Sequence, residues 1–285
     1  MDPKKTVTPL KQQVRIVEPA PENQKPLVDA IDGLSSKFDQ MLRLMDEQVH
    51  LQKVALLEDG NILRFNAHDA QKIALCLPDA QDDYVQRVIL RNRTFYEARL
   101  LALVQALGIV NEKSTVCDVG ANIGNHTVYF ACIMKAARVL SFEPQAHCYE
   151  TLRRNIELNG LEKRTVIHNC LVGAENGSGQ MERFNSRNLG GTAFSASKSG
   201  DVKLVTLDTS VPAKDLAKLD LIKIDVEGMQ IEVLKGAKNI LTKRKPAIWV
   251  ELLQRDDAYE ETAAYLAEFG YKPNKIGPND FVFQV

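Results

Sequence analysis

The segment from Val116 to Gly124 constrains most strongly what this chain can fold into. It reads as a short apolar strand that carries Asp118 near its end, followed by a turn between Gly120 and Gly124 and the start of a helix. Glycine permits a tight turn and a close approach of the main chain to a ligand, which the positive N-terminus of the next helix favours. This order is typical of a nucleotide-type cofactor site in a parallel α/β sheet.

A second half of such a site follows at the spacing of one strand–helix–strand unit. Residues 138–142 form another short apolar strand, which ends at Glu143-Pro144. A carboxylate at this place accepts hydrogen bonds from the hydroxyls of a ribose.

The spacing of the glycines distinguishes two cofactor classes. Dinucleotide sites use G-x-G-x-x-G, whereas this turn reads Gly120-x-x-x-Gly124 with Asn122 between. S-adenosylmethionine has no pyrophosphate to accommodate, and Asp118 can pair with its ammonium group directly or through water. The turn favours S-adenosylmethionine, and a nicotinamide-dependent oxidoreductase is the alternative.

The chain before this motif divides into three parts. Residues 1–26 hold five of the eleven prolines and predict a flexible leader. In residues 27–52, apolar side chains recur at steps of four and three, which predicts a coiled-coil helix that either forms a homodimer or packs on the body of the protein. Residues 53–93 predict a small accessory region, in which strands 54–57 and 62–65 form a hairpin, 72–77 adds a third strand, and a helix covers about 82–90.

Residues 94–285 predict the main domain. Thr94 and Glu97 have the spacing of a capping box at the start of a helix, and Tyr96 is either a core aromatic or a contact of the cofactor. Strands are expected near 115, 138, 165, 220, 246, 271 and 281, and helices near 124, 146, 229 and 257. Such alternation indicates a mostly parallel sheet with helices on both faces. The insertion between 176 and 206 is expected to roof a substrate pocket.

Two later strands end in acids. Residues 221–228 form a buried strand that ends with Asp225, Glu227 and a glycine, and residues 246–251 end with Glu251. Because charged groups are rarely buried without partners, we expect these carboxylates to converge at the cofactor crevice.

Taken together, these motifs resemble the FkbM-type methyltransferases, a class I family that depends on S-adenosylmethionine. The resemblance spans residues 94–285 and rests on the turn 118–127, residues 142–144 with Leu152 and Asn155, residues 222–228 with 234–237, and Glu251. It implies a Rossmann-like, seven-stranded sheet with a reversed last strand, and O-methylation of a hydroxyl, commonly on a sugar or polyketide. The chain departs from the family at Ala146 and Leu171, where we expect only altered packing near the adenine.

The resemblance and the motifs together assign candidate roles. The general base is Asp225, Glu227 or His126, with Asp225 preferred; the structural alternative for Asp225 is pairing with Lys223 or capping of the following helix. In a metal-assisted variant, Asp225 and Glu251 would hold a magnesium ion; we predict no resident metal, because no third ligand is evident. The residues expected to contact S-adenosylmethionine are Tyr96, Asp118, Gly120, Asn122, Gly124, Asn125, Glu143, Pro144, Asn169 and Cys170.

Composition limits the partners. A net charge of −1 argues against nucleic acid, and no stretch reaches the roughly 18 apolar residues of a membrane span, so we expect a cytoplasmic enzyme. The five cysteines lack C-x-x-C spacing, which predicts neither zinc nor disulfides.

The expected acceptor is a small molecule or glycan with a free hydroxyl. A coiled-coil assembly protein that only binds the cofactor is a third interpretation.

Overall fold

A computed structural model describes residues 25–67, 70–252 and 258–285 of the chain. The chain divides into two units, one up to Val49 and the other from His50 to Val285. The described part of the first unit consists of one helix, α1 (Lys25–Ala55), as far as Val49. Residues 50–55 of the same helix belong to the second unit.

Helix α1 presents a broad apolar face to solvent. Leu34 is 67% exposed and Phe38 is 56% exposed, and other large side chains share this exposure: Ile31, Met41, Leu42, Leu44, Met45 and Val49. The coiled coil and the homodimer predicted for residues 27–52 stay predictions.

The second unit is built on the predicted sheet. Its seven strands, in spatial order, are β12 (Lys272–Lys275), β13 (Asp280–Gln284), β11 (Ala247–Glu251), β10 (Leu219–Ile224), β3 (Thr115–Val119), β4 (Arg138–Phe142) and β5 (Thr165–His168). The strands from β11 to β5 run parallel, and β13 is antiparallel to both of its neighbours. This confirms the predicted class I methyltransferase fold with its reversed last strand.

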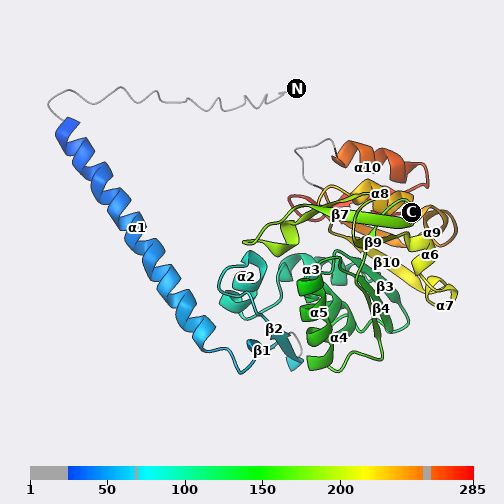
Figure 1. Cartoon of the computed structure of the whole chain (residues 1–285), viewed down its shortest axis with the longest axis horizontal. Coiled ribbons are helices and arrows are strands. Elements are labelled where there is room, and N and C mark those ends of the chain that lie inside the picture. The colour runs from blue at the N-terminus through cyan, green and yellow to red at the C-terminus, as the bar shows by residue number, and fades with distance from the viewer. Residues whose placement is uncertain (1–24, 68–69, 253–257) are drawn as a thin grey trace, which may run out of the picture. The chain divides into compact units, whose positions relative to one another are not determined.

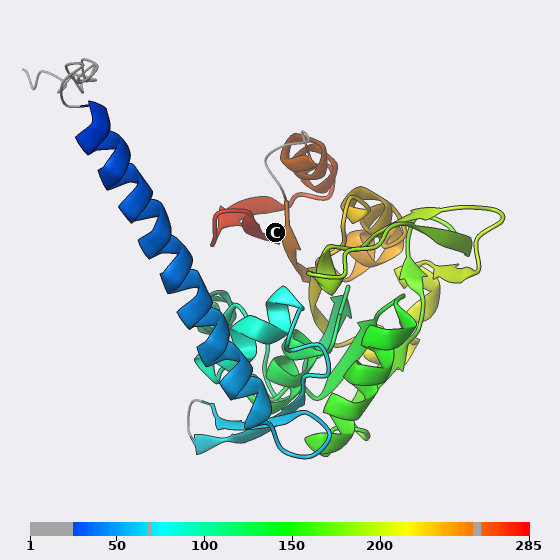
Figure 2. The same cartoon turned by 60° about the vertical axis from the view of Figure 1, so that its left-hand side comes forward.

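Helices cover both faces of the sheet, as Figures 1 and 2 show. Two hydrophobic clusters fill the spaces between sheet and helices. The helices of the first cluster are α2 (Tyr84–Asn92), α3 (Ala98–Ala106), α4 (Asn125–Cys132) and α5 (Ala146–Leu158), and those of the second are α6 (Leu207–Ser210), α8 (Gln230–Lys235), α9 (Lys238–Lys243) and α10 (Ala258–Ala267). A parallel sheet buried on both faces explains why its strands read as apolar runs.

The predicted insertion, together with residues 171–172 before it, folds into a second, four-stranded sheet. Its spatial order is β6 (Leu171–Val172), β9 (Val202–Val205), β7 (Gly177–Arg183) and β8 (Ala193–Ala196). A loop with a 3₁₀ turn, η3 (Leu189–Gly191), joins β7 to β8. A short helix, α7 (Ala213–Leu216), precedes β10.

The accessory region differs from the prediction in its hairpin. Strand β1 (Ile62–Asn66) pairs with β2 (Lys72–Cys76), the segment expected as a third strand. Residues 54–57 are not a strand, because α1 continues to Ala55 and the chain then turns; only Glu58 makes an isolated bridge, to Ile62. Leu75 and other side chains of the region join the hydrophobic cluster of the main sheet.

The start of α3 also differs from the prediction. The helix begins at Ala98, and Glu97 precedes it in a left-handed conformation with φ +55° and no capping hydrogen bond from its side chain. The capping box expected between Thr94 and Glu97 is therefore wrong. The five cysteines are buried free thiols.

Candidate active site

A cavity of about 520 Å³ lies at the carboxyl ends of the parallel strands. This volume is typical of a small-molecule site, and the carboxyl edge is where open α/β sheets bind ligands. The predicted site residues that line it are Tyr96, Gly120, Asn122, Asn125, His126, Glu143, Pro144, Cys170, Asp225 and Glu227. Glu251 lines it as well.

Both close packing and backbone conformation require glycine at two positions of the turn. Gly120 has φ +80°, and a Cβ atom there would lie 1.8 Å from the main-chain oxygen of Asp225. Gly124 has φ +86°, and its Cβ would lie 2.5 Å from a side-chain carbon of Leu152. Any larger residue at Gly120 would therefore push the turn away from the end of β10.

The side chain of Glu143 is fixed by the turn itself. Its carboxylate accepts the main-chain N–H of Asn122 and that of Gln145, both at 2.8 Å. Burial raises the pKa of Glu143 to about 7, although these two hydrogen bonds act in the opposite direction. Asn169 donates to the main-chain oxygens of Glu143 and Pro144, and so it fixes this segment without lining the cavity.

Asp118 lies below the cavity rather than on its wall. Its side chain is fully buried, accepts a hydrogen bond from the Thr127 hydroxyl at 2.6 Å, and lies 3.9 Å from the ammonium group of Lys223. Such a position does not fit a direct contact with the ammonium group of a ligand, and the contact through water that the sequence also allowed stays a prediction. Gly124 also lies outside the lining, because it serves as the N-cap of α4.

Two polar atoms at the cavity fit the predicted cofactor. The side-chain oxygens of Asn122 and Asn188 are buried and have no hydrogen-bond partner among the residues that the structure describes. A buried acceptor without a partner is costly, and a ligand that donates hydrogen bonds would relieve that cost. The hydroxyl, amino and ammonium groups of S-adenosylmethionine are donors of this kind.

At the ends of β10 and β11 the predicted carboxylates converge around a buried lysine. The Lys223 ammonium group lies 2.8 Å from the Asp225 carboxylate. Burial alone would raise the pKa of Asp225, but Lys223 outweighs it and holds that pKa below its ordinary value. Burial, with the charge of Asp225 beside it, raises the pKa of Glu251 to about 8. Near neutral pH, Asp225 is therefore ionised and Glu251 is mostly protonated.

His126 lies on the same edge, in the first turn of α4. Its Nε2 atom is 3.2 Å from the Glu97 carboxylate, although not in hydrogen-bond geometry, and its ring packs edge-on against Trp249 at 5.3 Å. The left-handed conformation of Glu97 thus occurs beside the cavity, where strained residues tend to gather. Asn125 exchanges two hydrogen bonds with the main chain of Tyr96.

Several lining residues were missed from the sequence. Val85 comes from α2 of the accessory region, Gln145 follows the Glu143-Pro144 pair, and Arg183 and Asn188 come from the second sheet and its loop. Only Gln145 lies next to a recognised motif. Arg183 and Asn188 lie in the insertion that was expected to roof the pocket, although neither was singled out, whereas Val85 reaches the cavity through long-range packing that no local pattern reveals. Among the described residues, no group of three His, Cys, Asp or Glu side chains is arranged to hold a metal ion.

The seven-stranded sheet, with its strand order and its cavity at the carboxyl edge, defines a class I methyltransferase-type fold. In agreement, the family described as methyltransferase FkbM domain matches residues 118–273. The chain therefore belongs to the FkbM methyltransferase family.

Individual relatives match to different extents. The hexuronic acid methyltransferase AglP of Haloferax volcanii is 32% identical over 197 residues, which cover 67% of this chain and 78% of AglP. Methyltransferase sdnD of Sordaria araneosa is 28% identical over 155 residues and 42% of this chain; the match spans 59% of its length. The crystal structure of methyltransferase FkbM from Methylobacillus flagellatus matches over 61% of this chain and 44% of its own chain, with 19% identity and a TM-score of 0.47.

None of the described helices has the length and hydrophobicity needed to cross a membrane.

Proposed function

We propose that the chain is an S-adenosylmethionine-dependent O-methyltransferase that acts on a hydroxyl of a sugar or glycan-type acceptor. The observation that carries the proposal is one cavity lined by both the glycine turn with Glu143 and the carboxylates of Asp225 and Glu251. The first pair suits an adenosyl cofactor, and the second suits proton removal from an acceptor. Membership of a methyltransferase family supports the same assignment.

The cofactor half of the cavity is pre-organised by hydrogen bonds within the chain. Glu143 is held by two main-chain amides, so its remaining lone pairs point in fixed directions for the ribose hydroxyls. The Asn122 side-chain oxygen is available to accept a further hydrogen bond. Bound S-adenosylmethionine would supply an activated methyl group on its sulfonium; this protein's residues would hold and align it.

The acceptor half favours a neutral reacting group. Asp225, Glu227 and Glu251 line this end of the cavity, and an anionic oxygen placed beside the ionised Asp225 would be repelled. A hydroxyl avoids that repulsion, and the ionised Asp225 carboxylate can accept its proton as the methyl group is transferred. Glu227 and His126 are the alternative bases.

The polar wall from the second sheet supports a carbohydrate acceptor. Arg183, Asn185 and Thr192 line this side, and such groups can hydrogen-bond a polyol. AglP, a relative, is named for methylation of a hexuronic acid. Arg183 lies on the wall at a place where it could receive the carboxylate of an acidic sugar.

Calorimetric titration with S-adenosylhomocysteine, beside NAD, tests the cofactor assignment. The wild type should bind S-adenosylhomocysteine and not NAD, and Glu143→Gln should weaken that binding at least about tenfold, because an NH₂ group replaces a carboxylate oxygen that accepts a main-chain N–H. Glu150→Gln, an exposed change on α5, is the matched control. Binding of NAD alone would instead support an oxidoreductase, and binding of neither ligand would support a protein without this activity.

A transfer assay with labelled S-adenosylmethionine and a panel of neutral and acidic sugars tests the acceptor and the base. Asp225→Asn should bind the cofactor normally but lose about 10²- to 10⁴-fold in turnover. Unchanged turnover would exclude Asp225 as the base. Resistance of the product to mild alkali separates an ether, formed on a hydroxyl, from an ester, formed on a carboxylate.

A further inference from the structure

The loop of residues 185–192 forms one wall of the cavity, yet it receives its support from outside its own sheet. Asn185, Asn188, Gly190, Gly191 and Thr192 line the cavity. Within the loop, the hydrogen bonds are short in range, such as that from the Gly191 N–H to the Asn188 oxygen at 2.9 Å. A segment with only local contacts opens easily unless other elements hold it.

Three hydrogen bonds from other elements fix the loop in place. The Leu189 N–H donates to the Asp83 carboxylate at 2.8 Å, and the Tyr84 N–H donates to the main-chain oxygen of Arg187 at 2.8 Å. Gln145 donates to the main-chain oxygen of Leu189 at 2.8 Å. Two of the three come from the amino end of α2, in the accessory region.

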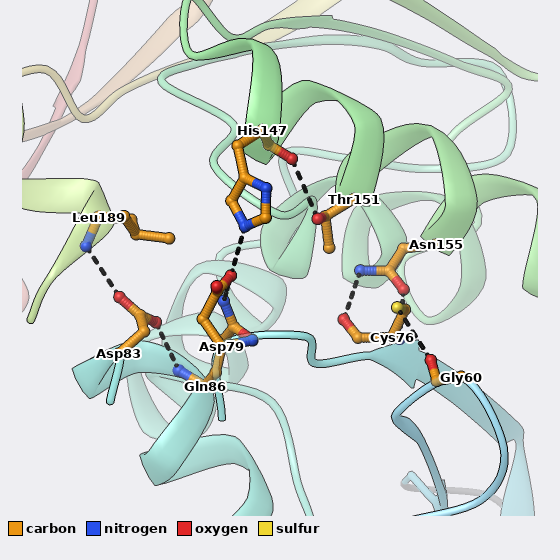
Figure 3. Close-up of polar contacts among 9 residues, drawn as sticks. All are labelled: Gly60, Cys76, Asp79, Asp83, Gln86, His147, Thr151, Asn155 and Leu189. Carbon is orange, nitrogen blue, oxygen red and sulfur yellow. Dashed lines mark hydrogen bonds and ion pairs between the residues drawn. The ribbon is translucent and has the colours of Figure 1, made fainter. Parts of the chain in front are cut away.

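Asp83 performs two tasks with its two oxygens (Figure 3). One accepts the Gln86 N–H at 2.9 Å and so caps α2; the other accepts the Leu189 N–H. The residue is 1% exposed. A buried carboxylate is costly without hydrogen bonds, and here two main-chain amides compensate it, one of them from Leu189, 106 positions further along the chain.

The same segment is tied to the cofactor half of the cavity. Asp79 accepts from the Gln86 side chain at 3.1 Å and lies 2.7 Å from the Nε2 atom of His147, in the first turn of α5 (Figure 3). That turn directly follows Glu143 and Pro144. Further along α5, Asn155 bonds both main-chain groups of Cys76. Residues 76–86 therefore bridge the two walls of one cavity.

We propose that Asp83 is a positioning residue that holds the loop 185–192 in place over the cavity, and that the accessory region thereby belongs to the catalytic unit. The inference deepens the proposed function, because it concerns the same cavity. Val85, two residues further on, itself lines the cavity, so the amino end of α2 both contributes to the cavity wall and fixes the loop beside it.

Asp83→Asn separates the two tasks. Asparagine caps a helix as well as aspartate, so its one oxygen can keep the bond to Gln86. Its NH₂ group would then face the Leu189 N–H, donor against donor, and the bond to the loop is lost. Asp83→Ser is a second variant, because serine also caps helices but is too short to reach the loop. Asp82→Asn, at an exposed neighbouring position, is the matched control.

Hydrogen exchange of the ligand-free protein measures directly how easily the loop opens. In Asp83→Asn and Asp83→Ser, amides of residues 185–192 should exchange about tenfold faster than in wild type and in Asp82→Asn, while β1, β2 and the central sheet keep their protection. Unchanged exchange in the loop would overturn the proposal. Faster exchange spread equally through the accessory region would also overturn it, since Asp83 would then be only a general stabilising residue.

Calorimetry with S-adenosylhomocysteine gives the functional readout. Asp83→Asn should raise its dissociation constant about tenfold, at a melting temperature close to that of Asp82→Asn. An unchanged dissociation constant would refute a role of Asp83, through the loop 185–192, in the cofactor site. If the wild type itself does not bind this ligand, the proposed function fails, whereas hydrogen exchange still decides whether Asp83 holds the loop.

Discussion

Replacing Lys223 with methionine tests whether the charges at the base of the cavity stabilise the fold as the geometry indicates. Lys223 is 3% exposed and lies between Asp118, which is fully buried, and Asp225. At an effective dielectric constant of about 20, the pair with Asp118 at 3.9 Å contributes about 4 kcal/mol of attraction. The pair with Asp225 at 2.8 Å would contribute about 6 kcal/mol, but the Asp225 side chain is 38% exposed, so solvent screening reduces that figure.

Much of this attraction offsets the cost of burying the lysine. The expected net loss in the free energy of unfolding is therefore about 3–5 kcal/mol, the usual result of removing one partner from a buried ion pair. Urea denaturation followed by the fluorescence of Trp249 measures it well, because Trp249 is the single tryptophan and pairs with Lys223 in the sheet register. Lys235→Met is the control; its ion pair with Glu232 is on the surface and should leave the midpoint unchanged.

The pH dependence gives a second check on the same change. Lys223 holds the pKa of Asp225 below its ordinary value, so in the wild type this stabilisation is present at neutral pH and is lost as the pH falls through the folded-state pKa. Without the lysine, the unpaired carboxylates destabilise the fold above their unfolded pKa values, and protonation relieves them. The gap between Lys223→Met and wild type should therefore narrow toward acid pH. A loss below about 1 kcal/mol at neutral pH, or a gap that widens in acid, would refute this reasoning.

Three further changes have expected outcomes. Leu34→Glu should lower the molar mass of the full chain by light scattering if α1 self-associates, whereas Gln40→Glu should not; the mass of a monomer in all samples would exclude the homodimer. The pKa of Glu251 is raised to about 8 on folding, so its carboxyl group destabilises the fold increasingly as the pH rises above the unfolded-state pKa. In urea titrations, the stability of Glu251→Gln relative to wild type should therefore increase from about pH 5 to pH 8. A difference that stays constant with pH would contradict this. Asn155→Ala should lose about 3 kcal/mol in the same assay, since it unpairs buried main-chain groups of Cys76 and Ile123, and a loss under about 1 kcal/mol would count against these bonds.

The strands of the main sheet could be predicted because each carries its signal locally. Val116 to Val119 and Leu221 to Ile224 are apolar runs that stop at acids and glycines, and a strand buried on both faces requires such a run. The same rule placed Asp225 and Glu251 correctly at one edge, since parallel strands expose their carboxyl ends together.

The errors have a common cause in contacts that no short pattern encodes. Residues 54–57 look like a strand, but the helix before them continues, and β2 is the partner that pairs with β1. Thr94 and Glu97 have capping-box spacing, yet Glu97 is turned toward His126 instead. The four-stranded sheet depends on pairing Leu171 with Leu204, across 33 positions of sequence. Predicting such pairs requires knowledge of the tertiary structure.

The arrangement at the ends of β10 and β11 shows how one lysine gives two neighbouring carboxyl groups different protonation states. Lys223 contacts Asp225 directly and keeps it ionised, whereas Glu251 has burial and the Asp225 charge acting on it, both of which favour the protonated form. Near neutral pH the pair therefore offers a carboxylate that can accept a proton beside a carboxylic acid that can donate a hydrogen bond. If both groups were ionised, their repulsion would disfavour the approach of an acceptor oxygen that gains negative charge as it loses its proton. Lys223, which itself lines the cavity, thus prevents two neighbouring negative charges at this edge, as the proposed hydroxyl acceptor requires.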